Sequence, residues 1–221
     1  MVGNRLWKLT LGVLTLLAMA GVLAASDDAP LHTYGGVAHL RLNLPLPLAA
    51  PIKTLDAINV KQFTFEIFPT GEGVEGGTVE NPKGGLEPFQ VTVNNGTYDH
   101  RSADPPLELD VLNSETVSIP KAPGGQIRFV YTVLYHGREA AVCTGIVQAW
   151  TLDQGKVVLT DQFSYDCRGG AGAKWMPKKH RLHVESGHFA AGDQPCCPSL
   201  VDAVDFRFDG DHVKPENVEV Q

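Results

Sequence analysis

The sequence predicts a mainly β fold, an antiparallel sheet or sandwich of about seven to nine strands with few short helices. Three observations support this prediction. The 221 residues include 23 glycines and 15 prolines, a content that favours short strands and turns over long helices. Apolar and polar residues alternate with the period of a half-buried strand in several segments. No segment combines a sustained helical period with capping residues at both ends.

Residues 25–56 form an N-terminal segment rich in proline and leucine. Residues 37–44 alternate, with Leu40, Leu42 and Leu44 on one side and polar side chains on the other, as in a short strand. The prolines that follow are typical of a linker. Two interpretations, a strand and a mobile tether, therefore stay open for this segment. Residues 57–221 are predicted to form a single β-rich domain.

Strand signals recur along the rest of the chain. The segment 127–135 is apolar or β-prone on both faces, as expected of a central strand that is covered on both sides. Residues 153–156 are typical of a hairpin turn, and so is the Asn-Gly pair at 95–96. A short helix is compatible with the sequence near 105–115 or 198–203. The predicted strands are 63–68, 89–94, 127–135, 142–152, 157–165, 178–184 and 204–208.

Residues 1–24 have the layout of a secretory signal peptide. Arg5 and Lys8 form a basic start, and an uncharged, mostly apolar run follows from 9 to 23. We expect cleavage after Ala24, with cleavage after Ala25 as the alternative. An uncleaved membrane anchor is disfavoured, because the apolar run is shorter than the roughly 20 residues of a membrane-spanning helix.

The charge and hydropathy of the remaining chain restrict its partners and its compartment. Cleavage would leave 16 basic and 25 acidic residues, which changes the formal net charge from −7 to −9. Such a chain is not expected to bind nucleic acid or anionic lipid in general. No second long apolar run occurs in the sequence, so no membrane span is predicted after cleavage. We therefore expect a periplasmic or secreted protein in an oxidising compartment.

An even number of cysteines in an exported chain predicts disulfides. The strand register of the predicted hairpin favours one pairing: if Leu152 faces Val157, then Cys143 faces Asp166, and a single β-bulge brings Cys143 opposite Cys167. The four cysteines are Cys143, Cys167, Cys196 and Cys197.

Cys196 and Cys197 are adjacent and lie between Pro195 and Pro198. They could form a vicinal disulfide, bind a soft metal ion as a pair of thiolates, or pair crosswise with Cys143 and Cys167. We favour a structural disulfide over a metal or redox role, since the Cys-x-x-Cys pattern of redox proteins is absent from the sequence.

The C-terminal part of the chain carries a recognisable pattern. A Gly-Asp-Gln-Pro-Cys-Cys-Pro-Ser segment at 192–199 precedes an aromatic and basic strand at 204–208, which is followed by Asp209 and Gly210. This pattern resembles the tail of a group of uncharacterised secreted bacterial proteins and lipoproteins, and residues 60–65 and 91–98 are similar to their opening strand and next hairpin. The resemblance implies export and a β-rich domain, and it brings no catalytic residues.

Motifs of enzyme active sites are absent from the sequence, including Gly-x-Ser-x-Gly, the phosphate loop and the dinucleotide fingerprint. His180 and His183 would point to opposite faces of a strand, so they are not expected to bind a metal ion together. Lys178, Lys179 and Arg181 make the same segment basic. We interpret it as a solvated edge strand that could weakly bind an anion or an acidic partner. No cofactor and no metal site is predicted.

The aromatic residues give a further hypothesis for binding. Six of them could line a sugar-binding face, although strand alternation assigns most of the six to the core. Trp175 lies outside the predicted alternation, in a glycine-rich loop at 168–177, where it is either a recognition residue or a lid over the core. The six aromatic residues are Tyr131, Tyr135, Trp150, Phe163, Tyr165 and Trp175.

These observations predict an exported, non-enzymatic protein that binds a ligand or associates with the cell envelope. The expected partner is a small molecule, a glycan or an envelope protein. Two alternatives stay open: a soft-metal or thiol-redox protein that uses Cys196 and Cys197, and a hydrolase with a site that the sequence does not reveal.

Overall fold

The computed structural model describes residues 31–48, 50–68, 70, 88–100, 106–136, 142–210 and 212–221. The predicted signal peptide and the glycine-rich stretch after Thr70 lie outside the described residues. Within the described part, three antiparallel sheets contain thirteen strands. The prediction of a mainly β, antiparallel fold is confirmed, with more strands than the sequence indicated, because several strands have only four residues.

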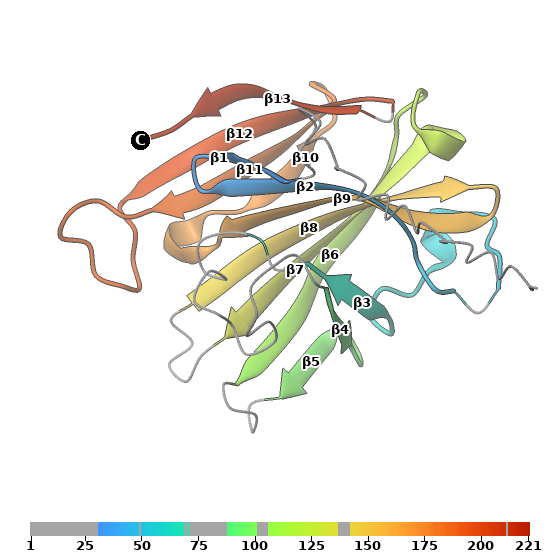
Figure 1. Cartoon of the computed structure of the whole chain (residues 1–221), viewed down its shortest axis with the longest axis horizontal. Coiled ribbons are helices and arrows are strands. Elements are labelled where there is room, and N and C mark those ends of the chain that lie inside the picture. Colours follow the sequence, from blue (N-terminus) through green and yellow to red (C-terminus); the bar gives the residue numbers. More distant parts are fainter. Residues whose placement is uncertain are drawn as a thin grey trace, which may run out of the picture.

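A seven-stranded sheet forms the middle of the molecule (Figure 1). In spatial order its strands are β1 (Leu31–Tyr34), β2 (Val37–Pro45), β9 (Lys156–Asp166), β8 (Val142–Asp153), β7 (Gln126–His136), β6 (Leu107–Ser118) and β5 (Thr97–His100). Two smaller sheets accompany it. They consist of β10 (Ala173–Met176), β11 (Arg181–His188), β12 (Leu200–Asp209) and β13 (His212–Glu219), and of β3 (Thr64–Ile67) and β4 (Phe89–Thr92).

Each face of the seven-stranded sheet buries its own apolar core. On one face, Trp150 of β8 packs against Phe65 of β3, with ring centroids 5.9 Å apart. On the opposite face, Phe163 of β9 packs against Phe206 of β12, with centroids 4.7 Å apart. Because side chains alternate along a strand, both faces of β7, β8 and β9 are covered. We refer to the two sides as the β3–β4 face and the β10–β13 face.

The N-terminal segment belongs to this fold rather than forming a tether. β2 pairs with β9 from Ala38 opposite Ser164 to Pro45 opposite Val158. Leu46 and Leu55 are then buried in the core of the β3–β4 face. Of the two interpretations of residues 25–56, the structure therefore contains the strand, which includes Pro45 as its last residue.

Three local expectations differ from the structure. The segment considered for a short helix near 105–115 lies largely in β6, where Leu107, Leu109 and Val111 alternate with polar residues, and the one near 198–203 leads into β12. The strand predicted at 178–184 begins only at Arg181, since residues 177–180 form a turn in which His180 has a φ of 52°. β11 is also not an edge strand, because it pairs with β10 on one side and with β12 on the other.

Candidate functional site

A groove of about 420 Å3 opens on the β10–β13 face, where the seven-stranded sheet extends beyond β10. Its floor consists of tyrosine and valine side chains from β7 and β9 together with the Cys143–Cys167 disulfide. One wall comes from β6 and the other from the Ala171–Lys174 segment that leads into β10. We call this feature the tyrosine groove. Its volume lies within the range of roughly 300–1,000 Å3 that is typical of small-molecule sites.

The three tyrosines of the groove are Tyr131, Tyr135 and Tyr165. The Tyr131 hydroxyl donates a hydrogen bond to Glu115 Oε1 (2.7 Å) and accepts one from the Trp175 backbone N–H. Burial, reinforced by the bond to Glu115, raises the pKa of Tyr131. Burial also raises the pKa of Tyr165 to about 12. Both phenols therefore stay neutral at physiological pH and act only as hydrogen-bonding groups.

A glycine determines how Tyr165 lies on the floor. A Cβ atom placed on Gly145 would lie 2.1 Å from the Tyr165 Cζ atom. Gly145 and Tyr165 are cross-strand neighbours in β8 and β9. The Tyr165 ring therefore lies across the β8 backbone at a position that only glycine permits.

A β-bulge shapes the β6 wall. The register of β6 against β7 shifts between Val111 and Asn113, which leaves Leu112 as the extra residue. Its side chain is 59% exposed and lines the groove. Beyond the bulge, Asn113 and Glu115 point to the groove side, whereas Leu109 and Val111 before it point into the opposite core. Bulges commonly re-aim side chains in this way next to functional sites.

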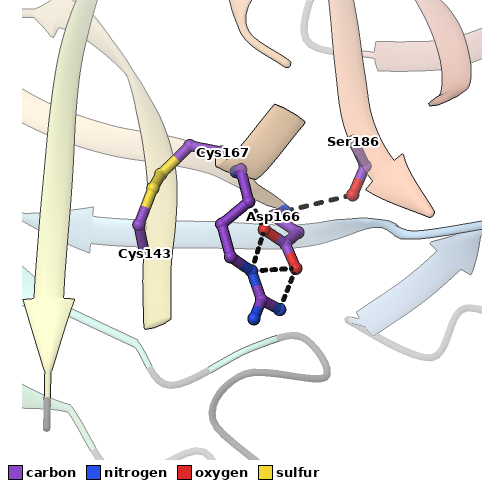
Figure 2. Close-up of a disulfide and its surroundings, with 5 residues drawn as sticks. Cys143, Asp166, Cys167 and Ser186 are labelled. Atoms are coloured by element: carbon purple, nitrogen blue, oxygen red, sulfur yellow. Dashed lines mark hydrogen bonds and ion pairs between the residues drawn. A yellow bond between two sulfur atoms is a disulfide. The ribbon is translucent and has the colours of Figure 1, made fainter. Parts of the chain in front are cut away.

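The Cys143–Cys167 disulfide joins the ends of β8 and β9 (Figure 2). The Leu152–Val157 pairing and one register shift between Ala149 and Trp150 place Cys143 opposite Cys167. The Cys167 N–H also donates to the Cys143 carbonyl oxygen (3.3 Å). The predicted pairing and the predicted single bulge are thus confirmed.

Arg168, directly after this disulfide, is held by Asp166. Its Nε donates to both Asp166 carboxylate oxygens at 2.9 and 3.0 Å, and its Nη2 donates to Oδ2 as well. The Asp166 N–H donates to Ser186 Oγ of β11 (3.0 Å; Figure 2). These bonds fix the end of the seven-stranded sheet against the four-stranded sheet, and the hydrogen bond to Asp166 raises the pKa of Arg168.

Arg168 also holds the loop that contains the second disulfide, Cys196–Cys197. Its Nη1 donates to the Pro195 carbonyl oxygen (2.8 Å), and its guanidinium lies 4.5 Å from the centre of the Phe189 ring. Both cysteines of the loop are exposed. The vicinal disulfide, one of the alternatives that the sequence left open, is therefore the pairing found.

The loop is further held by Asp193 and Pro198. Asp193 Oδ2 accepts hydrogen bonds from the backbone N–H groups of Ala190 (2.7 Å) and Ser199 (2.8 Å). The Pro198 ring lies so close to two glycines that a Cβ on Gly187 would be 2.6 Å from its Cγ, and one on Gly169 would be 2.9 Å from it. The loop is thus docked by specific contacts in addition to its disulfide.

The structure does not bring the binding residues suggested by the sequence into the groove as a group. Trp175 is 9% exposed and stacks on Phe129 of the core, with centroids 5.3 Å apart. Lys178 and Lys179 are exposed in the β10–β11 turn. Arg181 lies on the outer face of β11, where Nη2 is 2.5 Å from Glu216 Oε2 and Nη1 is 3.4 Å from Asp205 Oδ2.

The aromatic residues that the sequence suggested for a sugar-binding face also do not all lie in the groove. Trp150 and Phe163 are fully buried in the two cores, while Tyr131, Tyr135 and Tyr165 gather at the groove. Sequence reasoning missed Glu115, Lys174 and Leu112. A signal for Leu112 was present, because it directly follows Val111 and interrupts the alternation of apolar residues in that segment.

His183, one of the two histidines considered as a metal ligand, does not line the groove. His183 lies between two carboxylates, with Nδ1 2.7 Å from Asp205 Oδ1 and Nε2 2.9 Å from Glu185 Oε1. Among the described residues, no group of three or more potential ligands could hold a metal ion. The groove offers aromatic contact, hydrogen bonding and one charge on each wall.

A second cavity, of about 320 Å3, lies at the opposite end of the β10–β13 face. Its buried carboxylate, Asp161, accepts a hydrogen bond from His39 Nε2 (2.9 Å), and Arg41 lies opposite Asp161 in the register of β2 and β9. We call it the reference cavity.

No protein-family model, no curated protein and no solved structure matches the chain. None of the helices in the described part of the chain is long and apolar enough to cross a membrane.

Proposed function

We propose that this chain is an exported, non-enzymatic binding protein whose ligand occupies the tyrosine groove. The observation that carries the proposal is the groove itself, in which three tyrosines, a disulfide and a bulged leucine surround about 420 Å3. The leader-like N-terminus and the two disulfides support export into an oxidising compartment.

The ligand site is tested by a fragment screen that is not restricted to one ligand class. A 15N-labelled mature chain is titrated with a mixed library of small polar and aromatic fragments. We expect shifts of amide signals at Leu112–Glu115, Tyr131–Tyr135 and Ala171–Lys174, and we expect Tyr135→Ala to remove them. Val218→Ser is the matched control, since Val218 is an exposed apolar residue (45%) of β13, away from the groove lining.

Shifts confined to the reference cavity around Asp161, or hits that survive Tyr135→Ala, would refute the groove as the ligand site. Export is tested separately by mass analysis of the secreted protein. We expect an N-terminus at Ala25 or Ser26, and an intact Met1 in the soluble fraction would contradict export by cleavage.

A second candidate function is a thiol-redox or soft-metal role for Cys196 and Cys197, supported by the exposure of both residues. Thiol titration of native protein, combined with metal analysis, separates the two functions. The binding proposal expects no free thiols and no bound metal. Stoichiometric copper or zinc that is lost in a Cys196→Ser/Cys197→Ser variant would favour the metal role.

A further inference from the structure

We propose that the tyrosine groove takes a neutral saccharide. This inference rests on the proposed function, because it names the class of ligand for the same site. The ligand class follows from the floor, the walls and the main-chain hydrogen bonding of the groove.

The floor suits a ligand with a flat apolar face. Tyr131, Val133 and Tyr165 are almost fully buried, so the half-buried Tyr135 contributes most of the aromatic surface that the floor presents, beside the Cys143–Cys167 disulfide. A pyranose ring carries its C–H bonds on its faces and its hydroxyl groups around its edge. An aromatic floor can therefore cover a face of the sugar without leaving the hydroxyls unpaired.

The walls of the groove supply hydrogen-bond partners for the hydroxyl groups around the edge of a sugar ring that lies on the floor. On the β6 wall, the Glu115 carboxylate offers acceptor capacity beyond the bond from Tyr131. Asn113 Oδ1 accepts from the Ser114 N–H (2.8 Å), so its amide has Nδ2 hydrogens to donate. On the opposite wall, Lys174 is exposed and can donate through its ammonium group. The groove can thus both accept from and donate to a polyol.

The charges argue for a ligand without net charge. Glu115 and Lys174 place one negative and one positive group on opposite walls. The phenols of Tyr131 and Tyr165 are neutral, since burial raises the pKa of each. A polyanion or a polycation would meet a like charge on one wall, and the net charge of −9 expected after cleavage disfavours polyanions further.

The main-chain arrangement argues against a peptide that adds as a strand. The floor is the face of a sheet, and the main chains of β6 and β7 already pair with each other along the groove. β10 is the sheet edge nearest to the groove, but it has four residues, and the Trp175 N–H donates to the Tyr131 hydroxyl. Little edge is left for the main-chain hydrogen bonds on which strand addition depends.

The test uses the mature chain and a fixed set of probes: maltotriose, cellotriose, xylotriose, tri-N-acetylchitotriose, trigalacturonate and trialanine. Binding is followed by 15N–1H spectra and by saturation transfer to the ligand protons. We expect at least one neutral trisaccharide to shift the groove amides, with the strongest saturation transfer to its ring C–H protons. We expect Tyr135→Ala to weaken its binding at least about tenfold.

Two further variants separate the ligand class from a loss of folding. Glu115→Gln keeps an acceptor for the Tyr131 hydroxyl and removes only the charge, so we expect less than about a threefold change in affinity for a neutral sugar. Tyr135→Phe keeps the ring and should retain most of the affinity. Val218→Ser should leave binding unchanged.

The outcomes distinguish this inference from the proposed function. If the neutral trisaccharides leave the groove amide signals unchanged while trigalacturonate or trialanine shifts them, the ligand is not a neutral saccharide, and the groove is still a binding site. If neither these probes nor the fragment library shifts the groove amides, both proposals fail. A loss of affinity for the neutral trisaccharide above tenfold in Glu115→Gln would show that recognition requires the Glu115 charge, and would overturn the inference that the groove recognises a saccharide without charge.

Discussion

The two disulfides stabilise different kinds of structure. Cys143 and Cys167 are 24 residues apart in sequence, lie on adjacent strands and contribute to the floor of the groove. Cys196 and Cys197 are neighbours in an exposed loop. A disulfide stabilises mainly by the length of chain that it closes in the unfolded state. The first bond should therefore support the fold and the groove, whereas Arg168, Asp193 and Pro198 determine where the second lies.

Removing the first disulfide should have the largest effect on stability. In Cys143→Ser/Cys167→Ser the unfolded chain gains the freedom of the closed loop, so we expect the free energy of unfolding to fall by about 3 kcal/mol. Urea unfolding followed by circular dichroism measures this change. A loss below about 1 kcal/mol would contradict the role assigned to the bond.

Gly187→Ala should have the next largest effect on stability, because it disturbs the non-covalent docking of the loop that contains the Cys196–Cys197 disulfide. We call this loop the vicinal loop. The new Cβ would lie 2.6 Å from Pro198 Cγ and 2.9 Å from the Arg168 carbonyl oxygen. Such overpacking costs about 1–3 kcal/mol, here about 2. Gly172→Ala is the control, since a Cβ there meets nothing within 4 Å. Equal stability of the two variants would show that Pro198 moves without cost.

Removing the second disulfide should change stability least. For Cys196→Ser/Cys197→Ser we expect a change within about 0.5 kcal/mol, as for most exposed substitutions. In the native protein a mild thiol should reduce this bond first, because its cysteines are exposed while Cys143 and Cys167 are half-buried. Peptide mapping with a thiol-reactive label would show the order. Labelling of Cys143 or Cys167 before Cys196 would contradict it.

Acid should release the vicinal loop only at low pH. Hydrogen bonds from the Ser199 and Ala190 N–H groups lower the pKa of Asp193 below its usual value of 3.8. A carboxylate with a lowered folded pKa contributes above its unfolded pKa and loses that contribution as the pH falls through the folded value. The amide signals of Ala190 and Ser199 should therefore hold steady from pH 7 to about 4 and move only below it. A midpoint at or above the usual value of 3.8 would show that these bonds do not stabilise the carboxylate in solution.

The sequence predicted the first disulfide because the needed information was local. A four-residue turn fixed the register of β8 and β9, and one bulge, between Ala149 and Trp150, completed the pairing. The strand β13 was missed because Pro215 and several charged residues weaken its strand signal. β11 was taken for an edge because β10, its neighbour on one side, lies in the segment 168–177 that was interpreted as a glycine-rich loop.

The groove depends on contacts between segments that are distant in sequence. Strand alternation identified Tyr131 and Tyr165 as inward-facing, but whether they meet a core or an opening depends on where β10 ends. Trp175 was open to two interpretations for the same reason, and its stacking on Phe129 places it in the core. The bulge at Leu112 was visible in the sequence only as an interrupted alternation, and its effect on Glu115 required the structure.

The most direct test of this account compares one ligand on the two disulfide variants. Isothermal titration would measure the affinity of the tightest-binding neutral trisaccharide for the native chain, for Cys143→Ser/Cys167→Ser and for Cys196→Ser/Cys197→Ser, at a temperature where all three are folded. We expect the first variant to lose at least about tenfold in affinity and the second to bind like the native chain. Equal binding by the first variant, or a loss confined to the second, would contradict the claim that the ligand lies on the tyrosine and disulfide floor.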